Sequence, residues 1–178
     1  MKNIVVIVIT LFLSTISFSQ MNPFDSLRMV NVPYNREMIK KTDLIKVEKS
    51  IIDFINSYRK SQGKNVLTYN SELSDMAREW SDSLVKEAVL SESGVLRLRH
   101  TNNPYIENCY ASARYVDFNK FKFDFFYIET PKAVYDRWYN SKGHNAGMLM
   151  GGNTIGVGIS FGIREDGQMF CVATMLIK

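Results

Sequence analysis

The residues best suited to chemistry in this 178-residue sequence are its two histidines, His100 and His144. Histidine titrates near neutral pH and is the commonest metal ligand in proteins. A carboxylate, Glu107, follows His100 by seven positions, and Gly143 lets the backbone turn so that the ring of His144 can point inward. Both histidines fall in segments that we predict to be loops, where functional groups concentrate. We therefore predict that His100, Glu107 and His144 form one polar site.

Such a site allows several kinds of chemistry. Two neutral imidazoles and a carboxylate can hold zinc with a fourth position open to water, and that water can become nucleophilic near pH 7. The alternative is a hydrogen-bonded surface that binds metal only incidentally. The His-Glu-x-x-His motif of zinc proteases is absent from the sequence. A serine hydrolase built from Ser141, His144 and Glu107 is a further alternative, although no nucleophile elbow surrounds Ser141.

The two cysteines, Cys109 and Cys171, lie in apolar segments that we predict to be strands, where thiols are usually inert. In an exported chain they could form a disulfide, and closing so long a loop would stabilise the fold by roughly 4 kcal/mol. The sequence leaves open whether their Cα atoms lie close enough to pair.

The start of the chain predicts export. Lys2 precedes an apolar run over residues 4–13, which is short for a membrane span, and Ser17-Phe18-Ser19 forms a small-x-small cleavage pattern. We therefore expect residues 1–19 to be a signal peptide and the mature protein to be secreted or periplasmic, with no transmembrane segment after cleavage. A retained N-terminal anchor is the alternative.

The charge balance argues against a nucleic-acid partner. The chain has 22 basic and 18 acidic residues, and removing residues 1–19 takes away only Lys2, which leaves a net charge of +3. Nucleic-acid binding needs clustered basic charge, and the sequence contains no basic tract. Residues 20–41 carry no sustained period and read as an arm or linker, whereas residues 42–178 have the length of one domain.

Two amphipathic helices are predicted in the first half of this domain. Thr42 is a candidate N-cap for the first, and Gly63 a candidate stop. Asn70 is a candidate cap for the second. The apolar residues that recur at helical spacing are Val47, Ile51, Phe54, Ile55 and Tyr58 in the first helix and Leu73, Met76, Ala77, Trp80, Leu84 and Ala88 in the second.

The second half predicts a loop over residues 94–105, an extended segment over 106–116 and a third helix. That helix begins at Thr130-Pro131, a threonine cap with proline in the first position, and continues towards Gly143. Between these elements lies an aromatic segment, residues 118–127, which suggests a β-ribbon with one apolar face. The ribbon would either pack on the core or expose a patch that binds lipid, glycan or a protein partner. Its alternating residues are Phe121, Lys122, Phe123, Asp124 and Phe125.

The C-terminal residues predict a β-hairpin. Residues 155–163 alternate apolar side chains with glycine or serine, residues 164–167 form a tight turn, and residues 169–177 return as a strand. The returning strand is apolar on both faces, with Phe170, Val172 and Leu176 on one and Cys171, Ala173, Met175 and Ile177 on the other. Because both faces need cover, we predict an α+β fold, a three-layer α-β-α sandwich around a small, mainly antiparallel sheet.

Several segments resemble, in the same order, motifs of the CAP superfamily, which comprises cysteine-rich secretory proteins, antigen 5 and pathogenesis-related 1 proteins and is also called SCP-like. The resemblance covers residues 45–178 and is to the short bacterial type. The matching segments are INSYR at 55–59, LTYNSEL at 67–73, His100, Glu107-Asn108, VYDRWYNSKGHNAGML at 134–149 and IGVG at 155–158.

The resemblance implies an α-β-α sandwich with an open cleft that holds two histidines and two acidic residues and can bind a divalent metal, often zinc. His100, Glu107 and His144 match three of these four positions, and the fourth falls on or near Ser141. The glycine that usually precedes the Glu-Asn pair is Ile106 here. With one carboxylate missing, we expect a weaker metal site.

Family members bind sterols or lipids, block channels, modulate immunity or act against microbes. By resemblance we expect an exported protein that binds a lipid, glycan or protein partner in a cleft. The cleft residues are His100, Glu107, Asn108, Ser141 and His144, with His100 and His144 as ligands of zinc or another divalent metal. The alternative is a metal-assisted hydrolase that uses the same histidines and Glu107.

Overall fold

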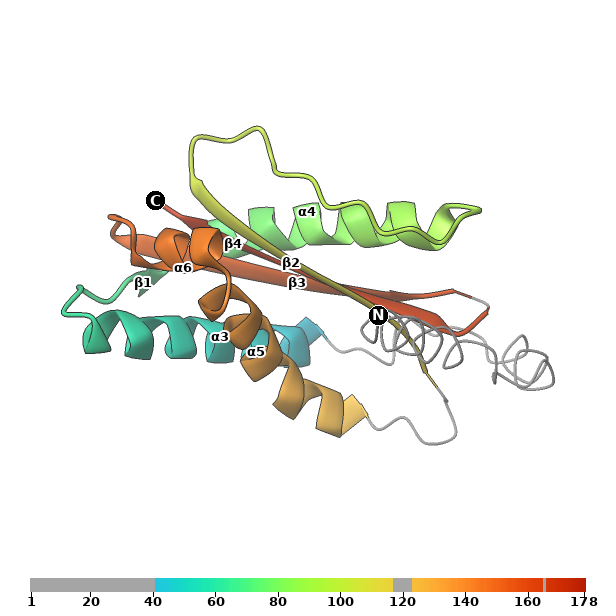
Figure 1. Cartoon of the computed structure of the whole chain (residues 1–178), viewed down its shortest axis with the longest axis horizontal. Coiled ribbons are helices and arrows are strands. Elements are labelled where there is room, and N and C mark those ends of the chain that lie inside the picture. Colours follow the sequence, from blue (N-terminus) through green and yellow to red (C-terminus); the bar gives the residue numbers. More distant parts are fainter. Residues whose placement is uncertain (1–40, 117–122, 165) are drawn as a thin grey trace, which may run out of the picture.

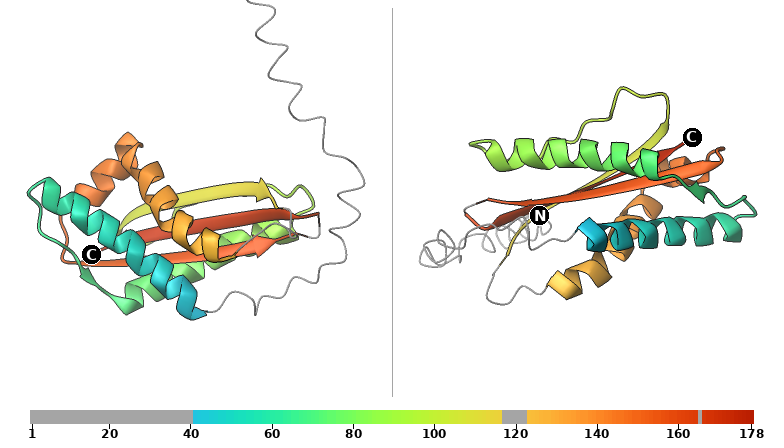
Figure 2. Two further views of the ribbon diagram at one scale, coloured as in Figure 1. Left: turned by 90° about the horizontal axis from the view of Figure 1, so that it is seen from below. Right: turned by 180° about the vertical axis from the view of Figure 1, so that it is seen from behind.

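The computed structural model describes residues 41–116, 123–164 and 166–178, and shows a β-sheet between two layers of helices (Figure 1). One helix, α4, covers one face of the sheet, and α3, α5 and α6 lie on the other, as the two further views in Figure 2 show. The predicted three-layer α+β sandwich is confirmed. The elements are α3 (Lys41–Ser61), β1 (Thr68–Tyr69), α4 (Ser71–Leu90), β2 (Ile106–Tyr115), α5 (Phe123–Tyr139), α6 (Lys142–Leu149), β3 (Thr154–Ile163) and β4 (Gln168–Ile177).

The sheet is mainly antiparallel, with strand order β1-β3-β4-β2. β4 is antiparallel to both β3 and β2, and the short β1 pairs in parallel with the start of β3. β2 therefore lies at one edge of the sheet, with its side chains in register with those of β4: Glu107 pairs with Leu176 and Cys109 with Thr174. Alternate residues of a strand point to opposite faces, so Glu107 and Cys109 share one face and Asn108 points to the other.

The core confirms that β4 is apolar on both faces. Phe170 and Val172 pack against Leu84 and Val85 of α4, while Met175 packs in the larger cluster on the opposite face. The cysteines are divided between these faces. Cys171 belongs to the cluster beneath α3 and α5, whereas Cys109 lies opposite Thr174, on the side of α4. Both thiols are buried and free, so the possible disulfide is not formed.

Glycines in β3 allow α4 to lie directly on the strand. A Cβ at Gly158 would overlap the backbone of Ala77 and Arg78, and one at Gly156 would overlap the backbone at Leu73. A side chain of any size would push helix and strand apart, since protein interiors are close-packed. The glycine alternation that predicts a strand is therefore also the feature that fixes the distance between α4 and the sheet.

The other edge of the sheet, along β3, is covered by side chains. Beyond its short pairing with β1, β3 has no neighbouring strand on this side, among the described residues, to accept hydrogen bonds from its backbone N–H groups. Buried N–H groups need acceptors, and here side chains supply them. Ser74 accepts a hydrogen bond from the N–H of Val157 at 3.1 Å, and the carboxylate of Glu48 accepts one from Ile159 at 3.1 Å. Glu48 comes from α3 and is fully buried, and it also forms a 2.6 Å ion pair with Arg78 of α4. The two helical layers are thus joined across this edge.

The first two helices agree with the prediction, apart from one cap. Asn70 is the N-cap of α4 and accepts a hydrogen bond from the N–H of Leu73. Gly63 has a φ of +68° and terminates the turn that follows α3, as predicted for a glycine at the end of a helix. Thr42 is not the cap, because the helix already includes Lys41. Among the described residues, no helix is long and apolar enough to cross a membrane.

The predicted start of the third helix is wrong. α5 begins at Phe123 and contains Pro131, rather than starting at Thr130. Proline inside a helix removes one internal hydrogen bond and crowds the carbonyl four residues earlier, which usually kinks or ends a helix, but α5 continues through Pro131. Threonine followed by proline therefore does not by itself fix a helix start. The predicted β-ribbon is wrong for residues 123–127, which are helical, while residues 118–122 of the aromatic segment lie outside the described residues.

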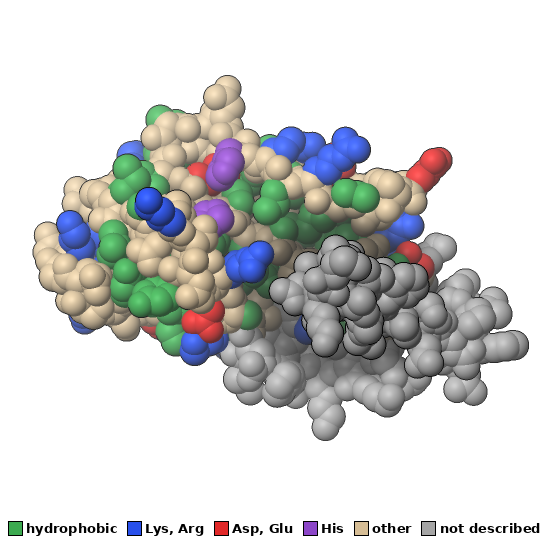
Figure 3. All heavy atoms as spheres, in the orientation of Figure 1, with side chains coloured by type: hydrophobic (Ala, Val, Ile, Leu, Met, Phe, Trp, Pro, Cys, Tyr) green, Lys and Arg blue, Asp and Glu red, His purple; other side chains and the backbone are tan. Residues whose placement is uncertain are grey.

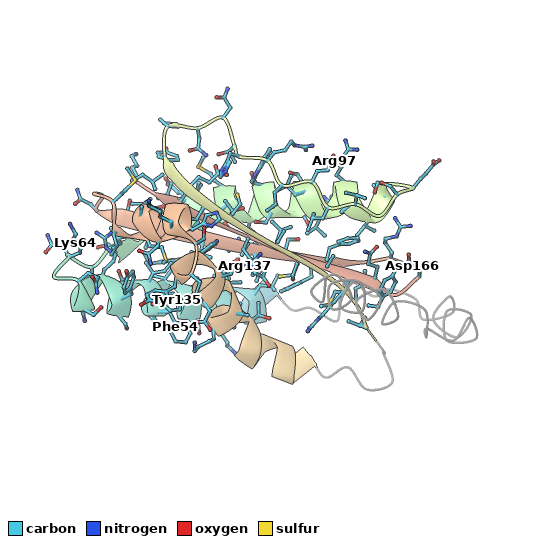
Figure 4. The ribbon with its side chains drawn as sticks, viewed as in Figure 1. Phe54, Lys64, Arg97, Tyr135, Arg137 and Asp166 are labelled. Atoms are coloured by element: carbon cyan, nitrogen blue, oxygen red, sulfur yellow. The ribbon has the colours of Figure 1, made fainter. Side chains whose placement is uncertain are left out.

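Aromatic rings hold α5 against α3. Phe54 stacks on Tyr135 with ring centroids 5.5 Å apart (Figure 4), and Tyr58 meets Tyr139 edge to face at 5.0 Å. Such ring pairs contribute about 0.5–1.5 kcal/mol beyond the area they bury. The hydroxyl of Tyr58 also donates to Asn145 of α6 at 3.1 Å, so the same cluster helps to position α6.

Candidate functional site

The site forms around the first residues of β2. Glu107 is almost buried, with a side chain 6% exposed, and its carboxylate holds the preceding loop. The backbone N–H of Thr101 donates to both carboxylate oxygens, at 3.1 and 3.0 Å, and the Thr101 hydroxyl bonds to Oε2. Asn103 adds a longer contact to Oε2 at 3.4 Å. These bonds fix the orientation of the carboxylate, so that Oε1 is the oxygen turned to the remaining partners.

His100 is one of those partners. Its Nδ1 lies 3.1 Å from Oε1 of Glu107, while its side chain is 66% exposed. The ring is thus anchored on one side by a buried carboxylate and open to solvent on the other. Such a carboxylate selects the tautomer of the imidazole and the direction in which the ring points.

His144 lies in the first turn of α6, and not in a loop as predicted. α6 packs against β2 through Asn108, whose side-chain amide donates to the backbone oxygen of His144 at 2.8 Å. A Cβ at Gly147 would lie 2.6 Å from Oδ1 of Asn108, so the glycine makes room for this contact. Ser141 is the N-cap residue of α6, but its side chain makes no capping hydrogen bond.

The ring of His144 is electrostatically unusual. Its pKa is lowered from the ordinary value, first by burial and then by the positive charges of His100 and Arg137. The ring therefore stays neutral to lower pH than a free imidazole, and its buried Nδ1 has no hydrogen-bond partner among the residues that the structure describes, Ser141 included. The two histidine side chains lie on the same face of the molecule, as the purple spheres in Figure 3 show. His100 reaches this face from the loop before β2 and His144 from α6.

Cys109 is the residue that sequence reasoning assigned no role. Its thiol lies 3.0 Å from Oε1 of Glu107, and burial, together with this carboxylate, raises the pKa of the thiol. One ligand atom each from His100, Glu107 and Cys109 lie within 4.8 Å of one another, and His144 is not part of this group. The sequence does contain a signal for the contact between Glu107 and Cys109, because residues two apart in a predicted strand point to the same face.

We expect Asn108→Ala to lower the free energy of unfolding by about 1–2 kcal/mol, because the backbone oxygen of His144 and the space beside Gly147 would both lose a buried partner. Urea unfolding followed by circular dichroism measures this. The matched control is Asn140→Ala, which removes an exposed side-chain bond to the backbone of Asp136 and should change stability by less than about 0.5 kcal/mol. Equal losses in the two variants would contradict the positioning role of Asn108.

The comparisons with known proteins bear on the same region. The family model described as "CAP: Cysteine-rich secretory protein family" matches residues 52–175. The chain belongs to the CAP family. This match covers α4, β2 and all but the last residues of the C-terminal hairpin, and so includes every residue of the site. It confirms the family membership expected from the motifs in the sequence.

One solved structure similar to this CAP chain is the crystal structure of MpPR-1i, with 11% sequence identity and a TM-score of 0.48. The similarity covers 73% of this chain and 84% of that one. A search of curated proteins gives no match.

The donors present are of the kinds that can bind a divalent metal ion. Imidazole nitrogen, carboxylate oxygen and thiol sulfur are all ligands of zinc. The predicted pair of metal ligands, His100 and His144, stays a prediction. The residues that lie closest together are His100, Glu107 and Cys109.

Proposed function

We propose that this chain is an exported CAP-family binding protein. The ligand contacts a surface formed by His100, Glu107, Asn108, Ser141 and His144, and is a lipid, a glycan or a protein partner. A divalent metal such as zinc, held by His100 and His144, can form part of this surface. Export rests on the signal-peptide pattern of residues 1–19.

The observation that carries the proposal is the orphaned Nδ1 of His144. A buried polar nitrogen without a partner is unfavourable by about 1–3 kcal/mol, and a bound ligand can supply the missing hydrogen bond. The lowered pKa of His144 favours the neutral ring, which can either donate or accept such a bond. Nearby, His100 offers an exposed ring whose inner nitrogen is already held by Glu107. The ring of His100, oriented by a carboxylate, and the ring of His144, with an unbonded nitrogen, lie on the same face, and this supports ligand binding.

A metal-assisted hydrolase is the second candidate, and the same nitrogen favours it. A neutral imidazole with an unpaired nitrogen, on the same face as a second imidazole, can act as a general base or bind a metal that activates water. The two functions differ in what the histidines do: in a binding protein they contact the ligand, and in a hydrolase they are needed for turnover.

Both candidates are tested with single variants. We expect His100→Ala and His144→Ala each to weaken binding by about tenfold or more, because each removes a hydrogen bond worth about 1.4 kcal/mol to the ligand. The probes are phosphatidylcholine–cholesterol vesicles, N-acetylglucosamine oligosaccharides and Zn²⁺ alone, measured by isothermal titration calorimetry. Lys64→Ala, at an exposed position after α3, is the control and should bind as the parent does.

The results of these measurements distinguish the proposed binding surface from the aromatic segment and from the hydrolase. Binding by the parent chain that survives in both histidine variants would contradict the proposed surface. Binding lost only in a Phe121→Ser, Phe123→Ser double variant would assign recognition to the aromatic segment instead. If the histidine variants keep binding but lose a chelator-sensitive hydrolysis of fluorogenic ester or peptide substrates, the hydrolase is the correct function.

A further inference from the structure

Three donor atoms of different chemistry converge on the α4 side of β2. Oε1 of Glu107 lies 3.1 Å from Nδ1 of His100 and 3.0 Å from the sulfur of Cys109. All three donors lie within 4.8 Å of one another. Ligand atoms around a tetrahedral zinc ion, with zinc–nitrogen distances near 2.0 Å and zinc–sulfur distances near 2.3 Å, are about 3.3–3.8 Å apart, so the two contacts of Oε1 are slightly short and the widest pair can need to close by about 1 Å. Small side-chain movements would therefore bring all three atoms onto one ion.

We propose that His100, Glu107 and Cys109 form a metal site for a thiophilic divalent cation such as Zn²⁺. The set combines one nitrogen, one oxygen and one sulfur ligand, and thiolate selects zinc over magnesium or calcium. The site shares His100 and Glu107 with the binding surface proposed above but uses Cys109 and not His144, so variants of Cys109 and of His144 distinguish the two proposals.

The carboxylate is prepared for this role. Thr101 holds Oε2 through its hydroxyl and shares its backbone N–H between both oxygens, and in this orientation Oε1 faces the imidazole and the thiol. Hydrogen bonds of this kind, made to a metal ligand by the residues behind it, fix its orientation and typically change metal affinity by 10- to 100-fold. Oε1 of this nearly buried carboxylate is thus held by the Thr101 N–H and still faces both the imidazole of His100 and the thiol of Cys109.

Burial gives the site an inner and an outer side. Cys109 is 4% exposed and Glu107 nearly as buried, whereas His100 is open to solvent. An ion would enter past His100 and keep its outer position for water or a ligand. The proton balance is simple: the thiol proton that now points at Glu107 leaves to solvent as the sulfur binds the ion, and neutral His100 binds through Nδ1 with its proton on Nε2.

The test uses the full chain and Co²⁺ as a spectroscopic probe for zinc. A sulfur ligand produces a thiolate-to-cobalt charge-transfer band in the near ultraviolet. We expect the parent chain to show this band with one equivalent of Co²⁺, and Cys109→Ser to lose it and to bind Zn²⁺ at least about tenfold more weakly in competition with a chromophoric chelator. Cys171→Ser is the matched control, because that thiol is buried on the opposite face of the sheet, and it should keep the band. His144→Ala should keep it too.

Three results would overturn the proposal: no band in the parent chain, a band that persists in Cys109→Ser, or loss of the band in Cys171→Ser. If Zn²⁺ binding is lost in His144→Ala and kept in Cys109→Ser, the metal lies between the two histidines, which rejects this inference while supporting the metal in the proposed function. X-ray absorption of the zinc-loaded parent chain decides the matter even if Cys109→Ser does not fold. A zinc–sulfur distance of about 2.3 Å supports the site, and a shell of nitrogen and oxygen alone rejects it.

Discussion

Glu48→Ala is expected to lower the free energy of unfolding by about 3–5 kcal/mol, because it breaks a buried ion pair from one side. Two groups would lose their partner. The N–H of Ile159 at the edge of β3 would have no acceptor, and Arg78, whose side chain is only 15% exposed, would lose its two hydrogen bonds of 2.9 and 2.6 Å. Arginine stays protonated at neutral pH without this partner, so in the variant its charge would remain at this largely buried position with only the exposed carboxylate of Asp75 as a partner among the described residues. Chemical denaturation at neutral pH measures the loss.

The control for this variant is present in the same ion-pair network. Asp75 pairs with Arg78 from the exposed side, with a side chain 60% exposed. Exposed ion pairs contribute about 0–1 kcal/mol, so Asp75→Ala should change stability by no more than that. If Asp75→Ala is as destabilising as Glu48→Ala, the buried contact across the sheet edge does not have the importance assigned to it.

Gly158→Ala is expected to lower the free energy of unfolding by about 3 kcal/mol, the upper part of the range for overpacked cores. The added methyl group would overlap the backbone of Ala77 and Arg78, which, unlike a flexible side chain, cannot rotate away. α4 would have to move off β3, and the packing of the whole layer would loosen. Thermal unfolding followed by circular dichroism measures the effect.

Gly151→Ala is the control for that substitution. A Cβ at Gly151 would meet no atom of the described part of the chain within 4 Å, so the variant should be unchanged or more stable by up to about 1 kcal/mol. A similar loss in both variants would show that glycine flexibility, and not close approach of α4 to β3, makes position 158 sensitive.

The sequence predicted the elements well wherever one face of a segment is buried. The helical period predicted α3 and α4, and the apolar alternation predicted β3 and a β4 that needed cover on both faces. These patterns are local, because burial of one face imposes a period of 3.6 or 2 residues. They failed where local signals are ambiguous. Thr130-Pro131 has the composition of a helix start but lies within α5, and α6 is too short to show a clear period.

The candidate site was predicted in part. His100 and Glu107 were expected to meet, and their side chains lie 3.1 Å apart. Cys109 was set aside as an inert strand residue, although its place two residues after Glu107 puts it on the same face of β2. Its contact with Glu107 depends on the rotamers of both side chains and on the loop that brings His100 over them, which no periodicity reports.

The sequence by itself thus determined which segments are helix or strand and which of their faces are dry, because that information lies in the spacing of neighbouring residues. Only the tertiary structure decided which distant residues meet. It joined Glu48 to Arg78 across the edge of the sheet, and it placed His100 and Cys109 on the same carboxylate oxygen. Such contacts depend on strand register, on the distance between packed layers and on the course of a loop, and these are set by the packing of the whole chain rather than by any single segment.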